Sequence, residues 1–165
     1  PPRQSPIEPL MRGGVQERGR RPGTESAGLA SAFALALEEA HDSHASFALK
    51  ASAQRDRLIE GLQTAISSVE INGGKNTVPH ILNVSLIGRD TDYVAALLDE
   101  AGFAVSTRSA CATDEEGSVL AYTNDSKRAS STLRISWGPT TTERELKHFL
   151  GALVHAVRFV DTNTV

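Results

Sequence analysis

The residue with the most obvious chemistry is the only cysteine, Cys111, which lies in a run of small and polar residues from Ser106 to Gly117. A lone thiol forms no disulfide within its own chain, and a free cysteine is often a small buried apolar residue. The neighbours of Cys111 argue against burial, because they are Arg108 and the acidic residues at 114–116. A thiol beside a guanidinium is in an environment that favours a reactive thiolate, whereas nearby acids disfavour it. The neighbouring residues therefore indicate a reactive thiol in a loop. They do not decide whether Arg108 or the acidic residues have the larger effect on its pKa.

Arg134 is the second candidate, because a planar guanidinium suits the recognition of a carboxylate. Residues Thr132–Trp137 alternate as a strand does, which places Leu133, Ile135 and Trp137 on one face and Arg134 on the other. This strand is expected to neighbour the one that leads to Cys111. An arginine on the polar side of a strand is also commonly just solvated, so both interpretations stand.

The spacing of the histidines indicates that they lie on solvated helix faces and do not form a metal site. His41 and His44 are three residues apart, and His148 and His155 are seven apart. Neither pair has the third or fourth ligand nearby in sequence that zinc requires, so we predict no metal site. His80 is the best partner for a Cys–His dyad, although no spacing rule pairs it with Cys111.

A basic, glycine-rich segment, Met11–Thr24, precedes the first helical pattern. It is either a connector or an anion site in which backbone amides and Thr24, at a helix N-terminus, face a phosphate. Its glycine spacing matches neither the Rossmann nor the Walker fingerprint. Such a loop with no strand before it is typical of the middle of a protein, so we expect the chain to be a fragment.

The bulk properties limit the class of protein. The 165 residues, 39% of them apolar, suit one domain or a small domain with an incomplete second one. A net charge of −3 gives no support for nucleic-acid or anionic-membrane binding. The absence of a long apolar run and the single cysteine predict a cytoplasmic protein with no membrane span.

The periodicity predicts an α/β fold in which a sheet packs against helices. We expect helices over about 24–42 and 46–67, a third capped by Asp90 or Thr91 and ended by Gly102, and a fourth opened by the capping box Thr142–Glu145. Strands are expected near Val69 and over residues 81–87, 103–106 and 132–137, with an irregular stretch before the last of them. The final helix has an inward stripe of Leu146, Phe149, Leu150, Leu153 and Val157.

Four segments together resemble the pyridoxal-phosphate-dependent cysteine desulfurases of the NifS/IscS type. Residues 13–25 resemble the family's GGGQERGxRxGTEN segment, and residues 80–85 its HILNVS-like strand. Residues 109–111 resemble its SAC active-site cysteine, and residues 131–143 its STLRIS…TTxxE block.

The resemblance implies a homodimeric fold-type I enzyme that converts L-cysteine to L-alanine. Cys111 would be the nucleophile that carries a persulfide, Arg134 would bind the substrate carboxylate, and Thr24 would bind the cofactor phosphate of the partner subunit. The sulfur acceptor would be an iron–sulfur scaffold or a thiolation protein. Residues 1–45 would be the end of the large cofactor-binding domain, and residues 46–165 the small C-terminal α/β domain.

The chain also departs from the family pattern. Arg108 stands where members often have glycine before SAC, and Val15 and Ser26 replace a glycine and an asparagine. The Schiff-base lysine, which follows a histidine in an upstream segment of the family, has no counterpart here, so we expect this chain to be inactive alone. Two alternatives remain: a class V lyase that does not use Cys111, and a non-catalytic small domain that binds a partner.

Overall fold

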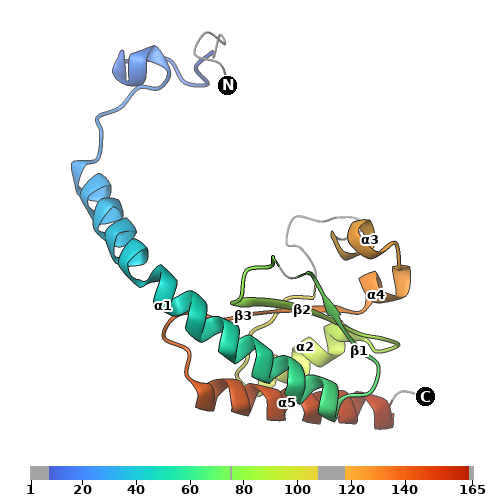
Figure 1. Cartoon of the computed structure of the whole chain (residues 1–165). Coiled ribbons are helices and arrows are strands. Elements are labelled where there is room, and N and C mark those ends of the chain that lie inside the picture. The colour runs from blue at the N-terminus through green and yellow to red at the C-terminus, as the bar shows by residue number, and fades with distance from the viewer. Residues whose placement is uncertain (1–7, 75, 108–117, 164–165) are drawn as a thin grey trace. The chain divides into compact units, whose positions relative to one another are not determined.

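The computed structural model describes residues 8–74, 76–107 and 118–163. Its elements follow in the order η1 (Gln16–Gly19), α1 (Ala27–Ala65), β1 (Val69–Asn72), β2 (Ile81–Leu86), α2 (Thr91–Glu100), α3 (Ser118–Thr123), α4 (Ser126–Ser130), β3 (Thr132–Ser136) and α5 (Glu143–Asn163) (Figure 1). The chain divides into two compact units at His44 and Ala45, within α1. The second unit confirms the predicted α/β class.

Three antiparallel strands form the sheet in the order β1–β2–β3. The register pairs Val84 with Ile71 on one side and with Leu133 on the other. Because side chains alternate along a strand, this register gives the sheet one apolar face and one polar face. The predicted faces of β3 are confirmed, with Arg134 exposed on the polar one.

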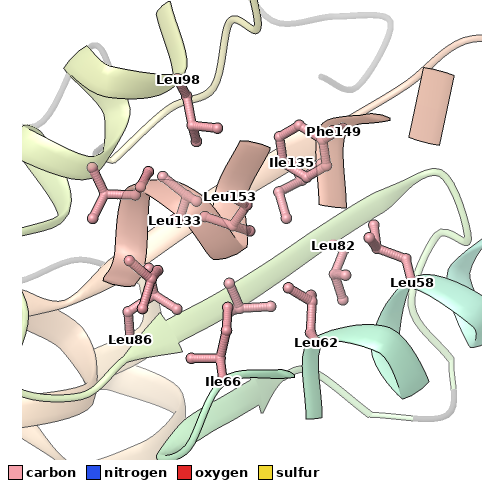
Figure 2. Packing of buried hydrophobic residues seen from close by; sticks show 14 of the residues in the cluster. Leu58, Leu62, Ile66, Leu82, Leu86, Leu98, Leu133, Ile135, Phe149 and Leu153 are labelled. Carbon is pink, nitrogen blue, oxygen red and sulfur yellow. The ribbon is translucent and has the colours of Figure 1, made fainter. Parts of the chain in front are cut away.

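Helices α2, α5 and the C-terminal part of α1 bury the apolar face, and they lie on one side of the sheet (Figure 1). A Cβ on Gly61 of α1 would overlap the end of the Leu150 side chain of α5, so the two helices contact each other at this glycine. Figure 2 shows the side chains that meet there: Leu58, Leu62, Ile66, Leu82, Leu86, Leu98, Leu133, Ile135, Phe149 and Leu153.

The helix at the start of the chain differs from the prediction. The two helices expected over 24–42 and 46–67 are one helix, α1, because residues 41–46 contain neither glycine nor proline to interrupt it. The Ser43 hydroxyl donates to the Glu39 carbonyl at 2.8 Å, so even this polar stretch keeps its helical geometry.

The segment that leads to Cys111 also differs. The strand expected over 103–106 is wrong except at Ser106, which forms an isolated bridge with Arg134. After the turn at Gly102, Phe103 packs edge-on against Phe149 at 5.5 Å between ring centres. The backbone reaches β3 only at Ser106, which exchanges bonds of 3.1 and 2.7 Å with Arg134.

The stretch expected to be irregular contains α3 and α4. The Asp125 carboxylate caps α4 by accepting from the amides of Lys127 and Arg128 at 2.9 and 3.1 Å. Asp125 before a short run without glycine is a helix-start signal that could have revealed α4.

The predicted caps of the longer helices are confirmed. Asp90 caps α2, and Glu145 accepts from both the backbone amide and the hydroxyl of Thr142 at 2.7 Å. These two bonds lower the pKa of Glu145. At the other end of α5, Arg89 forms two hydrogen bonds with Asp161, of 2.7 and 3.0 Å, and lowers the pKa of that carboxyl. None of the described helices has the length and apolar composition needed to span a bilayer.

In the first unit, α1 exposes large apolar side chains around its axis. Leu29, Phe33 and Leu37 lie along one side of the helix, and Leu35 lies on another. Their exposed fractions are 73%, 70%, 59% and 58%, respectively. A helix that is apolar on several sides is normally buried between partners.

Gln54 joins α1 to the loop between β3 and α5. Its side-chain carbonyl accepts from the Trp137 indole at 3.0 Å, and its amide donates to the Thr141 carbonyl at 3.1 Å. Gln54 is 1% exposed, so water cannot replace these bonds.

Replacing Gln54 with leucine keeps the volume but leaves the buried Trp137 indole and the Thr141 carbonyl without these partners. We expect the Gln54→Leu variant to lose about 1–3 kcal/mol of unfolding free energy in urea denaturation. The control is Gln63→Leu, at an exposed position of the same helix, which should change stability by less than about 0.5 kcal/mol. Equal losses in both variants would contradict the structural role of Gln54.

Candidate functional site

The candidate site is the polar face of the sheet around Arg134. Across the β2–β3 pairing Arg134 lies opposite Asn83, and on its other side it bridges to Ser106. Its guanidinium donates to the Ser106 hydroxyl at 3.2 Å. Neutral polar groups therefore flank an exposed cation, and no described carboxylate forms an ion pair with it.

The site adjoins the residues that lead to the cysteine segment. The Thr132 hydroxyl donates to the Thr107 carbonyl at 3.0 Å, next to the Ser106–Arg134 bridge. Both interactions hold residues 106–107 on β3, immediately before the segment 108–117. Cys111, Arg108 and the acids at 114–116 lie outside the described residues.

A hydrogen-bonded network holds α4 against the same face. The Arg128 guanidinium donates to the Asn72 side-chain carbonyl at 2.6 and 3.2 Å and to the Ile71 carbonyl at 3.1 Å. In return, the Ser85 hydroxyl donates to the Arg128 carbonyl at 2.8 Å. Glu70 adds a longer ion pair of 3.8 Å to Arg128.

The network continues from β1 to β2. The Asn72 amide donates to the Asn83 carbonyl oxygen at 2.7 Å and to the Ser85 hydroxyl at 2.8 Å. Asn72 is buried, so its amide depends on these partners. Asn72, Asn83 and Arg128 were not predicted from the sequence as site residues. The polar positions of β2 were visible in its alternation, but their neighbours depend on the sheet register.

The histidines are placed as follows. His41 and His44 are exposed and contact each other, with ring centres 5.7 Å apart. His148 and His155 lie exposed on α5. Within the described ranges, no group of three or more His, Cys, Asp and Glu could hold a metal ion. His80 packs on Phe47 at 5.1 Å between ring centres, and its relation to Cys111 lies outside the described residues.

Thr24 lies in the first unit, just before α1. It is exposed and stands two residues before Ser26, whose hydroxyl accepts from the Leu29 amide at 3.3 Å. The first turn of α1 carries no acidic side chain. The carboxylate of Glu25, which follows Thr24, forms an ion pair with Arg21. The Thr24 hydroxyl and the first backbone amides of the helix therefore suit an anion such as phosphate.

Comparisons of the sequence and of the structure with known proteins match the same family. Residues 13–149 match the family described as Aminotransferase class-V. The chain is 33% identical over 162 residues to a cysteine desulfurase IscS of Clostridium botulinum, covering 92% of this chain and 40% of that protein. It is 32% identical over 144 residues to the cysteine desulfurase NifS of Azotobacter vinelandii, covering 85% and 36%.

A solved structure of a NifS-like protein superposes with a TM-score of 0.79 at 29% identity, covering 96% of this chain and 41% of that one. The chain thus spans about 40% of the length of the first curated relatives it matches.

Replacing Arg128 with methionine keeps the aliphatic stem but removes the donors to Asn72 and Ile71. We expect Arg128→Met to lose about 1–3 kcal/mol of unfolding free energy in urea, because buried acceptors are left unpaired. Lys127→Met, at the exposed neighbouring position, is the control and should remain within about 0.5 kcal/mol of the unsubstituted chain. A stability change no larger than that of the control would contradict the anchoring role of Arg128.

Proposed function

Because this chain belongs to the class-V aminotransferase family, we propose that it is the C-terminal portion of a pyridoxal-phosphate-dependent cysteine desulfurase. The observation that carries the proposal is the pairing of Arg134 with Ser106 directly before the segment that contains Cys111. A carboxylate held by Arg134 would lie close to the base of the cysteine segment. The family's named desulfurases, at about one-third identity, support the same reaction class.

Residues 1–45 would be the end of the large domain and residues 46–165 the small domain. The exposed apolar side chains of α1 before residue 44 support the first assignment, since such a helix needs partners on several sides. The remaining part of the large domain is the partner we propose for it. The self-contained core of residues 45–165 supports the second assignment.

Thr24 and the start of α1 would hold the phosphate of pyridoxal 5′-phosphate, in the site of the partner subunit of a homodimer. When bound, this cofactor supplies the electron sink that allows the C–S bond of the substrate to break. The donor set around Thr24 fits a phosphate. The lysines of this chain, at 50, 75, 127 and 147, do not follow a histidine, and Lys50 donates to the Pro139 carbonyl at 2.8 Å. The anchoring lysine would therefore come from the rest of the large domain.

Arg134 and Cys111 would perform the steps that belong to this chain. Arg134 would bind the carboxylate of L-cysteine and orient its sulfur toward Cys111. The Cys111 thiolate would attack that sulfur, forming an S–S bond as the C–S bond breaks, and the carbon would take up a proton to give L-alanine. The persulfide on Cys111 would pass its outer sulfur to an acceptor such as an iron–sulfur scaffold, in the reducing cytoplasm.

The first test is turnover by the chain itself. Mixed with pyridoxal phosphate and L-cysteine, the 165-residue chain should release no sulfide and no alanine above the level of the free cofactor, because it lacks the anchoring lysine. Sulfide release and alanine are measured in parallel. Sustained turnover would contradict the division of the active site between this chain and the rest of the large domain.

The second test is Cys111→Ser in the polypeptide extended upstream in its reading frame. We expect about a hundredfold or greater loss of ³⁵S transfer from labelled cysteine to the protein and to an acceptor, because the nucleophile is removed. Thr113→Ala, in the same segment, is the control and should retain transfer. Unchanged activity in Cys111→Ser would favour a lyase that does not use this thiol. A complete lack of activity and of cofactor binding in the unsubstituted polypeptide would favour a non-catalytic binding domain.

A further inference from the structure

The network on the polar face determines which way two side-chain amides point. A guanidinium only donates hydrogen bonds, so the Asn72 atom that meets Arg128 at 2.6 Å must be the carbonyl oxygen. The Asn72 nitrogen is then the donor toward β2. Its partner on Asn83, at 2.7 Å, must be the Asn83 carbonyl oxygen.

The orientation of the Asn83 amide determines which of its atoms is available on the side of β3. Asn83 lies between Asn72 on β1 and Arg134 on β3. Because the Asn83 carbonyl oxygen points to Asn72, the Asn83 amide nitrogen points away from Asn72. Among the described residues this nitrogen has no hydrogen-bond acceptor, although two N–H groups are available.

Arg134 has spare donors beside it. Its guanidinium makes one described side-chain hydrogen bond, to Ser106 at 3.2 Å, and the side chain is exposed. The neighbouring Asn83 is half-buried. An exposed guanidinium next to an amide nitrogen of set orientation is an arrangement that suits an anion with two oxygens.

We propose that Asn83 is a second hydrogen-bond donor to the carboxylate bound at Arg134, held in its donating orientation by Arg128 through Asn72. This inference rests on the proposed role of Arg134 and adds to it a specificity residue on β2. Arg128 and Asn72 act only through Asn83, so they are positioning residues. The ligand is the carboxylate of a small amino acid.

The chemistry explains what the second donor adds. A guanidinium alone attracts any small anion, whereas a guanidinium and an amide at a set spacing match the two oxygens of a carboxylate. The half-buried Asn83 also keeps its orientation without rearrangement when the ligand arrives, because the network has already ordered it.

The experiment is a titration of the ¹⁵N-labelled chain with L-alanine, observed at the Asn83 side-chain amide and the Arg134 Nε by NMR. Ethylamine at equal ionic strength, which lacks the carboxylate, is the ligand control. We expect saturable shifts of both signals with L-alanine and none with ethylamine.

Three variants separate the roles. Asn83→Leu, which is neutral and of similar size, should raise the apparent Kd for L-alanine by roughly tenfold to a hundredfold, because it removes one hydrogen bond to a charged group. Arg128→Gln should raise it by a smaller factor, and Arg128→Lys, which still donates to Asn72, should restore binding. Ser136→Ala, an exposed position on the same face, should leave the Kd unchanged. Backbone amide spectra verify that each variant is folded.

The outcomes are distinct. An unchanged Kd in folded Asn83→Leu overturns the role of Asn83 and leaves that of Arg134. If Arg128→Gln leaves the Kd for L-alanine unchanged, the positioning role of Arg128 is overturned. No saturable shift in the unsubstituted chain overturns the whole inference. The measurement involves neither Cys111 nor the cofactor, so failure of the desulfurase proposal appears separately, in the ³⁵S transfer experiment.

Discussion

Backbone hydrogen bonds align β2 with β3 so that Leu82 faces Ile135 and Asn83 faces Arg134. This register determines the core and the candidate site at once, because successive side chains point to opposite faces. A slip of one residue would turn Arg134 into the core and Leu133 into solvent. Burial of the apolar face under α1, α2 and α5 therefore also determines which side chains lie together on the polar face.

The polar face is stabilised by interactions of a different kind. Asn72 is buried, and every described hydrogen bond of its amide goes to another side chain of the network. Such a network is stable only when its members are satisfied together. It also connects α4, which follows the cysteine segment in the chain, to the strand beside Arg134. The part of the chain after Cys111 and the part before it are thus both attached to the same sheet.

Helix α1 links the two units and has a different environment in each. After residue 45 its apolar side chains Leu58 and Leu62 are buried in the core. Before residue 44 its large apolar side chains, such as Leu29 and Phe33, are exposed. The same helix therefore buries its apolar side chains in one unit and exposes them in the other. This contrast agrees with a chain that spans about 40% of the length of its curated relatives.

The sequence alone was sufficient for features that depend on neighbouring residues. The alternation of β3, the caps Asp90 and Thr142–Glu145 and the family blocks were all predicted, because each is encoded within a few positions. The α/β class followed from the order of such local patterns along the chain. Tertiary structure decided what lies side by side across the sheet: the Ser106–Arg134 bridge, the contact of Arg128 with Asn72, and the place of Asn83 between them. These pairs join residues 28, 56 and 11 positions apart, and only strand register and helix packing bring such residues together.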